Sequence, residues 1–183
     1  MFQYGIDASF IDWQNEDMDI IPASHKHATG VAAIWNFYIR ETIATFNSAE
    51  KSVAEVIELI DAKTQVKQPI LVAVIDDQVI GFATYGAFRS GVGYARVAEH
   101  TIQLSKSALG QGTGRMLMNE LELFGLSNGI HSFFAGISGE NQGAVKFHAA
   151  VGYAHVTTIP KVGWKFDRWH DLILMRKELG IKE

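Results

Sequence analysis

The stretch EHTIQLSKSALGQGTGR, residues 99–115, decides how the middle of the chain folds. Residues 94–104 are mostly apolar and predict a β-strand, with Glu99 as a charged residue inside it. Residues 110–114 contain three glycines at alternate positions and predict a tight turn. From residue 115 to about residue 127 apolar residues recur at three-to-four spacing, which predicts a helix. A strand, a glycine-rich turn and a helix therefore follow one another.

The glycine-rich turn has the chemistry of an anion site. Gly110, Gly112 and Gly114 allow successive backbone N–H groups to point into one concavity, and the following helix adds the partial positive charge of its N-terminus. Such a site suits a phosphate or a pyrophosphate. The turn is neither a Walker A loop nor a G-x-G-x-x-G dinucleotide fingerprint. The alternative is an ordinary strand-to-helix turn without a ligand.

N-terminal to this stretch the pattern predicts a short strand, two helices and a hairpin. Residues 18–21 form a candidate strand ended by Pro22, and a helix is expected from Ser24. A second helix begins at Ser52, which lies at capping-box spacing from Glu55. Residues 70–75 and 79–85 predict two strands joined by a turn at Asp76-Asp77. The side chains expected to be buried include Val31, Ile34, Val53, Val56, Ile57 and Ile60 and, in the later helix, Met116, Leu117, Leu121 and Phe124.

The remaining chain predicts further alternation of strands and helices. Strands are expected at residues 131–137, 153–159 and 172–179, and a helix at residues 142–151. The order β-α-α-β-β-β-α-β-α-β-β indicates an α+β (mixed α/β) fold, in which helices flank a central, mostly antiparallel sheet. Residues 1–15 have weak periodicity and are interpreted as an N-terminal extension, followed by a single domain over residues 16–183.

Composition narrows the class of protein. The chain has 183 residues, is 48% hydrophobic and carries a formal net charge of −4, which suits one globular domain. The few basic residues do not cluster, so no nucleic-acid partner is expected. No apolar run approaches the roughly 20 residues of a membrane helix, and no signal peptide is visible. We therefore expect a soluble, cytoplasmic protein.

Cysteine and histidine usage excludes several kinds of site. The chain has no cysteine, which excludes disulfides, thiolate zinc sites and a cysteine nucleophile. His25 and His27 are two residues apart and cannot share one helix face, and no His-Glu-x-x-His motif is present. We expect no metal.

Several motifs together resemble the GNAT superfamily of N-acetyltransferases. Residues 109–114 fill the frame of motif A, Q/R-x-x-G-x-G/A, with Leu109 in place of the usual Gln or Arg. Residues 141–148, followed by Val151-Gly152-Tyr153, are similar to the segment N-x-x-A-x-x-x-Y…G-F/Y of this superfamily. The resemblance covers roughly residues 17–179 and implies the GNAT fold.

A narrower resemblance is to the phosphinothricin and methionine sulfoximine acetyltransferases. It rests on residues 94–102, on Tyr85-Gly86-Ala87-Phe88-Arg89, and on residues 162–171. This resemblance implies transfer of an acetyl group from acetyl-CoA to the amine of a small amino-acid-like substrate. It implies contacts to the cofactor from Ile102, Gln103, Leu104, Leu109, Gly110, Gln111, Gly112, Thr113, Gly114, Arg115 and Asn141. The backbone N–H of Leu104 is the candidate group that polarises the thioester carbonyl.

Two side chains are candidates for proton transfer. Glu99 lies in an otherwise apolar strand, where a carboxylate is costly without a role or a partner, and it occupies the position of the subfamily's general base. Its alternative is a surface carboxylate, or one paired with an arginine. His148 lies where many members carry a tyrosine that protonates the departing thiolate, and its alternative is a half-exposed helix histidine.

The substrate side is less defined. Arg89 suits a substrate carboxylate, and its alternative is a solvated arginine on a loop. The apolar walls of the pocket are expected from Phe46, Phe88 and Tyr94, for which the alternative is an ordinary core position. His100 neighbours Glu99 but points to the opposite face of a regular strand, so its alternative role is a packed histidine. The full set of predicted substrate contacts is Phe46, Phe88, Arg89, Tyr94, Glu99 and His100.

An aromatic and basic cluster precedes the last predicted strand. It comprises Trp164, Lys165, Phe166, Arg168, Trp169 and His170. We expect it to complete the substrate pocket or to form the contact of a homodimer. Two other functions stay open at this point. One is a regulator that binds acyl-CoA without catalysis, for which Glu99 is unnecessary, and the other is an acetyltransferase for a different amine.

Overall fold

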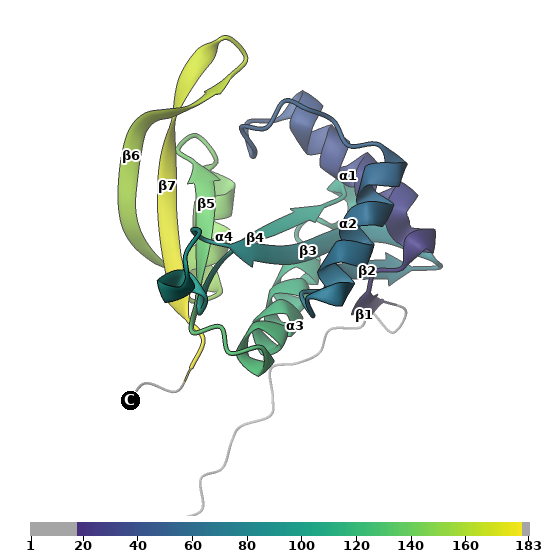
Figure 1. Ribbon diagram of the computed structural model, residues 1–183. Helices are drawn as coiled ribbons and strands as arrows, with labels where there is room; N and C mark the ends of the chain where they lie inside the picture. Colours follow the sequence, from purple (N-terminus) through teal and green to yellow (C-terminus); the bar gives the residue numbers. More distant parts are fainter. Residues whose placement is uncertain (1–17, 181–183) are drawn as a thin grey trace, which may run out of the picture.

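The computed structural model describes residues 18–180, which form a seven-stranded sheet flanked by helices (Figure 1). The predicted extension, residues 1–15, lies outside the described residues, as do the first two and last three residues of the predicted domain. The strands are β1 (Asp19–Pro22), β2 (Leu71–Ile75), β3 (Gln78–Ala87), β4 (Val97–Leu104), β5 (Ser132–Ser138), β6 (Ala154–Lys165) and β7 (Arg168–Glu178). The α-helices are α1 (Ala28–Glu41), α2 (Val53–Gln65), α3 (Thr113–Ser127) and α4 (Gln142–Ala150), and single 3-10 turns are η1 (His25–His27), η2 (Val92–Tyr94) and η3 (Lys106–Ala108).

The mixed α/β architecture with a mostly antiparallel sheet is confirmed. The strand order is β1-β2-β3-β4-β5-β7-β6, and every neighbouring pair is antiparallel except β4 and β5. The helices α1 and α2 pack on one face of the sheet around Val56 and Phe82, and α3 packs on the other around Leu117 and Phe133. Within residues 18–180, no helix has both the length and the apolar character needed to cross a membrane.

The predicted hairpin and capping box are confirmed in detail. Asp76 and Asp77 form the turn between β2 and β3 with φ angles of 49° and 60°, the left-handed pair that suits the twist of a two-residue hairpin. At the start of α2, the Ser52 hydroxyl accepts from the Glu55 N–H, and the Glu55 carboxylate accepts from the Ser52 N–H.

Some predicted boundaries and inward positions were wrong. Strand β4 begins at Val97 rather than at residue 94, because residues 92–94 close a 3-10 turn. Pro22 is the last residue of β1 rather than its stop, since a proline is tolerated on an edge strand. Val53 and Met116 were expected inside but are 40% and 39% exposed, because each lies in the first turn of its helix at the rim of the core.

The last two strands are longer than predicted. Strand β6 continues to Lys165, and β7 begins at Arg168. The aromatic and basic cluster therefore forms the end of the β6–β7 hairpin, within the strands and their turn, rather than preceding the last strand. The periodicity was hidden because the register shifts between Ile159 and Gly163, around Pro160, and because the first turn residue, Phe166, is not typical of left-handed turns.

The position of the site is set by the only parallel pair among the described strands. Strands β4 and β5 pair over three residues, from Val97 opposite Ser132 to Glu99 opposite Phe134. Beyond Glu99 the strands diverge, because β4 continues its ladder with β3 and β5 continues its ladder with β7. The sheet therefore opens between the carboxyl ends of β4 and β5.

Candidate active site

The opening between β4 and β5 leads into a cavity of about 1220 Å³. This volume exceeds the range of about 300–1,000 Å³ typical of small-molecule pockets. The cavity is lined by the end of α1 and residues 42–47, by β4 from Glu99 to Leu104, by the glycine-rich turn, by the end of β5 and by α4. It therefore spans both faces of the sheet.

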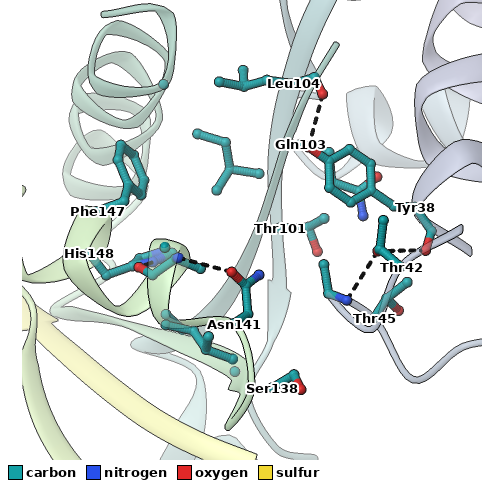
Figure 2. A pocket seen from close by; sticks show the side chains of 18 of the residues that line it. Tyr38, Thr42, Thr45, Thr101, Gln103, Leu104, Ser138, Asn141, Phe147 and His148 are labelled. Atoms are coloured by element: carbon teal, nitrogen blue, oxygen red, sulfur yellow. Dashed lines mark hydrogen bonds between the residues drawn. The ribbon is translucent and has the colours of Figure 1, made fainter. Parts of the chain in front are cut away.

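Side chains of β4 divide between these two faces. His100, Ile102 and Leu104 share one face: His100 contacts His148 of α4, and the Leu104 side chain lies beside Gly114 of α3. Glu99, Thr101 and Gln103 share the other. Figure 2 shows Thr101 and Gln103 on the same side as Tyr38 and Thr42, with Phe147 and His148 on the opposite side. The expectation that Glu99 and His100 point in opposite directions agrees with this geometry.

The backbone of β4 also presents groups to the opening. The β3–β4 ladder has no register shift, and its flanking bonds run from Ser105 N to Ile80 O and from Phe88 N to Val97 O. The alternation of an antiparallel ladder therefore turns the N–H and C=O of Ile102 and Leu104 away from β3. The Leu104 carbonyl accepts a hydrogen bond from the Tyr38 hydroxyl at 2.9 Å. Because β5 diverges from β4 here, these groups face the opening rather than a neighbouring strand.

The glycine-rich turn has the geometry of an anion cradle. Gly110 and Gly112 have φ angles of 76° and 81°, and a Cβ on either would enter open space within the cavity wall. Gly112 is the N-cap of α3 and supplies no side-chain cap, so the first N–H groups of α3 are free to bind an anion. Gly114 has a different role, since a Cβ there would lie 3.1 Å from the Phe147 ring.

The other predicted cofactor residues fall around this turn. Leu109 is 56% exposed at the rim, and Arg115 lines the cavity while donating to the Ala150 carbonyl at 3.3 Å. Gln111 donates to the Ser107 carbonyl at 2.8 Å, which holds the turn from outside. Thr113 is fully buried and is not among the residues that line the cavity, so its contact to the cofactor stays a prediction.

Asn141 joins the cavity from the start of α4. Its side-chain carbonyl accepts from the Ala144 N–H at 3.1 Å and caps the helix. The amide nitrogen of the same side chain is left to donate to a ligand, and the contact of Asn141 to the cofactor stays a prediction.

The Glu99 carboxyl group lies where the two strands part. Burial raises its pKa because the charged form is less well solvated there. None of the ion pairs formed within residues 18–180 includes Glu99. The Oε1 atom of Glu99 packs against the backbone of Gly136 in β5. A Cβ added at Gly136 would lie 2.6 Å from this oxygen, so the carboxylate occupies space that only a glycine leaves open. Gly136 was not predicted as a site residue, because a single glycine within an apolar strand gave no signal.

His148 and His100 form a buried pair, so the alternative of a half-exposed helix histidine was wrong. His148 is 5% exposed, its Nδ1 lies 2.8 Å from the Ala144 carbonyl, and its Nε2 lies 3.0 Å from Nε2 of His100. Since a carbonyl only accepts, His148 Nδ1 carries the proton and its Nε2 accepts from His100. Burial lowers the pKa of His148, and lowers that of His100 to about 3, so both rings are neutral at pH 7.

The predicted substrate contacts divide into two groups. Phe46 lines the cavity, whereas Phe88, Arg89 and Tyr94 do not. Phe88 stacks on Phe134 with a centroid distance of 4.2 Å, and Arg89 lies over the Phe88 ring. The polar residues Tyr38, Thr42, Thr45 and Thr101 line the cavity and were not predicted. The Thr and Asn residues directly after the α1 pattern were the available signal, because they follow a helix that ends at this edge of the sheet.

Comparison with known proteins decides the family. The acetyltransferase (GNAT) domain model matches residues 23–174. This chain belongs to the GNAT acetyltransferase family. It is 31% identical to an L-amino acid N-acyltransferase of Escherichia coli over 162 residues, which cover 88% of this chain and 94% of that protein. It is 28% identical to an L-methionine sulfoximine/L-methionine sulfone acetyltransferase of Salmonella typhimurium, over 88% of this chain and 95% of that protein.

A solved GNAT structure agrees with this assignment. The phosphinothricin acetyltransferase of Sinorhizobium meliloti, solved in complex with acetyl-CoA, superposes with a TM-score of 0.84 at 27% identity and covers 90% of this chain and 89% of that chain. The predicted GNAT fold is therefore confirmed, and the protein is an acetyl-CoA-dependent N-acetyltransferase.

Proposed function

We propose that this GNAT protein acetylates the amine of a small amino-acid-like substrate of the methionine sulfoximine, methionine sulfone or phosphinothricin type. The observation that carries the proposal is the position of Glu99, at the point where β4 and β5 part and on the β4 face that Tyr38 and Thr42 share. The relatives named for these substrates span most of this chain, which supports the substrate class.

The donor is proposed to bind through the α3 and α4 face of the opening. The N–H groups at the start of α3 and the turn 110–112 fit the pyrophosphate, and the backbone of Ile102 and Leu104, with Asn141, fits the pantetheine arm. The Leu104 N–H is the proposed donor to the carbonyl oxygen of the thioester. Acetyl-CoA supplies the activated acetyl group, so no covalent enzyme intermediate is needed.

Glu99 is proposed to act as the general base for direct attack. Its carboxylate accepts a proton from the substrate ammonium, and the freed amine forms a C–N bond to the acetyl carbon while the C–S bond breaks. The nitrogen releases its second proton to solvent as the amide forms, and the thiolate takes up one proton to leave as the thiol of coenzyme A. Burial supports this role, because a raised pKa brings a carboxylate closer to the range in which a general base works at neutral pH. His148 is the proposed proton donor to the leaving sulfur. This role requires its Nδ1–H to release the Ala144 carbonyl and its Nε2 to take up a replacement proton, because a neutral ring that only lost its Nδ1 proton would become an imidazolate.

The acceptor is proposed to lie on the α1 face, between Glu99 and residues 42–47. Thr45 and Thr101 provide hydroxyl groups there for a polar, oxygen-rich ligand, whereas the Thr42 hydroxyl already donates to the Tyr38 carbonyl. Arg89, Phe88 and Tyr94 stay predicted substrate contacts, on the loop that follows Gly86, the β3 partner of Glu99.

A homodimer is proposed for the β6–β7 hairpin. Trp164, Phe166 and Trp169 are each more than half exposed at its end, an arrangement that suits a contact between protein surfaces. Light scattering at micromolar concentration tests it, and a monomeric mass that is independent of concentration would contradict it.

The function is tested by thiol release from acetyl-CoA with methionine sulfoximine, methionine sulfone and phosphinothricin, each product being identified by mass spectrometry. We expect turnover with at least one of them. Binding of acetyl-CoA without turnover across a wider panel of amines would instead support an acyl-CoA-binding regulator. Turnover confined to polyamines, aminoglycosides or protein N-termini would assign a different acceptor class.

A further inference from the structure

Lys165, the last residue of β6, is a buried lysine without a carboxylate partner among the described residues. It is 4% exposed, and its ammonium group donates to the backbone carbonyls of Thr42 and Thr45, both at 2.7 Å, and of Tyr38 at 3.4 Å. The three N–H groups of an ammonium are thus matched by three carbonyl oxygens. A buried charge is costly unless it is satisfied in this way.

These carbonyls belong to the end of α1 and to the segment that follows it. Helix α1 ends at Glu41, and the carbonyls of its last turn lack partners within the helix. Residues 42–47 form neither helix nor strand, so no regular ladder holds them. A cation at a helix C-terminus is also favoured by the helix dipole. The hydrogen bonds within the segment, such as those from the Ala44 N–H to the Thr42 hydroxyl and from the Asn47 N–H to the Thr45 hydroxyl, join only near neighbours. Lys165 therefore fastens this segment to a strand that is distant in sequence.

The same hairpin supports this segment at a second point. The Phe46 ring packs directly on the backbone of Gly163, where a Cβ would lie 2.2 Å from a ring carbon. The ring also stacks on His170 of β7, with a centroid distance of 5.7 Å and an interplanar angle of 20°. His170 in turn contacts the Lys165 carbonyl at 3.0 Å and the Glu140 carboxylate at 2.8 Å. Residues 42–47 are therefore held to the β6–β7 hairpin by hydrogen bonds to Lys165 and by packing of Phe46, and His170 contacts both of these residues.

We propose that Lys165, together with Gly163, is a positioning residue for the amine acceptor. Residues 42–47 line the cavity on the face of β4 that carries Glu99, whereas the donor elements line the opposite face. Lys165 does not line the cavity and acts through the segment it holds. The inference rests on the proposed function, because it assigns residues 42–47 to the acceptor side.

The main test is Lys165→Met, which keeps the length of the side chain and removes the ammonium group. We expect the KM for the amine to rise about tenfold, since small displacements of positioning groups carry large kinetic effects. The KM for acetyl-CoA should stay within about twofold, and hydrogen exchange at the amides of residues 43–47 should become faster. The matched control is Lys161→Met, an exposed lysine on the same strand, which should leave all three measurements unchanged.

A second variant keeps the test decisive if Lys165→Met does not fold. Gly163→Ala displaces the Phe46 ring and should raise the KM for the amine in the same selective manner. An unchanged KM for the amine in the folded variants, or equal increases in both KM values, would overturn the proposal. The exchange measurement needs no acceptor. If the enzyme shows no turnover on amino acids, the proposed function is contradicted. Faster exchange at residues 43–47 in the Lys165 variant would still show that Lys165 holds this segment.

Discussion

The two faces of β4 are built in different ways. On the donor face, the turn 110–114 and the start of α3 are contiguous in sequence and offer mainly backbone N–H groups. On the proposed acceptor face, residues 42–47 are held by a lysine more than a hundred residues away, and Glu99, the proposed base, lies against a glycine of another strand. A donor shared by a whole family can be bound by backbone geometry, which tolerates the change at Leu109. Acceptor selection depends on side chains assembled by the fold.

The largest effect is expected for Glu99→Gln, which should lower the rate of the chemical step without changing the binding of acetyl-CoA. In Glu99→Gln the side chain keeps its shape and loses its basicity, so we expect kcat to fall by about 100-fold or more, as for other positioned general bases. The dissociation constant for acetyl-CoA, measured by calorimetry, should be unchanged. A variant with near-normal kcat at neutral pH would exclude Glu99 as the base.

The pH profile of the wild-type enzyme belongs to the same prediction. A base must be deprotonated to act, so kcat/KM should rise with pH as Glu99 ionises. Because burial raises its pKa, this rise should occur above pH 4.5, the ordinary value for glutamate. In Glu99→Gln this limb of the profile should disappear.

The next prediction concerns how the acceptor face holds its base. A Cβ at residue 136 would lie 2.6 Å from Oε1 of Glu99, so Gly136→Ala should displace the carboxylate. We expect kcat to fall about tenfold or more, because a base displaced by about 1 Å loses its alignment. Acetyl-CoA affinity and thermal stability should change little. The control is Gly139→Ala, in which the added Cβ meets Asp171 rather than Glu99. Equal losses of kcat in the two variants would indicate a general effect on the sheet.

The donor face is tested through its backbone. Gly112→Ala forces a residue with a Cβ to adopt a φ of 81° and places a methyl group in the open cradle. We expect the KM for acetyl-CoA to rise about tenfold, equivalent to about 1.4 kcal/mol, with the KM for the amine unchanged. Gly129→Ala is the matched control, since Gly129 has a φ of 75° and open space but lies at the other end of α3. A similar change in both variants would attribute the effect to backbone strain alone.

The contrast between the two faces also explains which features could be predicted from the sequence and which could not. The sheet, the β2–β3 turn at Asp76-Asp77 and the start of α2 were predictable because propensity, capping and periodicity act over a few residues. Glu99 and the glycine-rich turn were identifiable as candidates for the same reason, and their roles stay predictions. Gly136, Lys165 and the pairing of His100 with His148 were not, since each depends on a contact between segments distant in sequence.

The buried histidine pair is the exception on the donor face, because it joins β4 to α4 through side chains 48 residues apart. Each ring is neutral when folded, whereas an unfolded histidine titrates near pH 6.5. Below that pH the unfolded chain therefore binds more protons than the folded one, and stability is lost as the pH falls. With a folded pKa of about 3, His100 alone should account for a loss of about 2 kcal/mol between pH 7 and pH 5.

The measurement is denaturant unfolding at several pH values, for wild type and for the double variant His100→Leu/His148→Phe. Replacing both partners avoids leaving one buried polar group unsatisfied. We expect the double variant to lose less stability than wild type on acidification, with a residual slope from His27, whose pKa burial also lowers. Equal slopes would mean that the folded pair already holds an additional proton. In the same variant, a kcat lowered about tenfold would support His148 as the proton donor to sulfur, and an unchanged kcat would assign that proton to solvent.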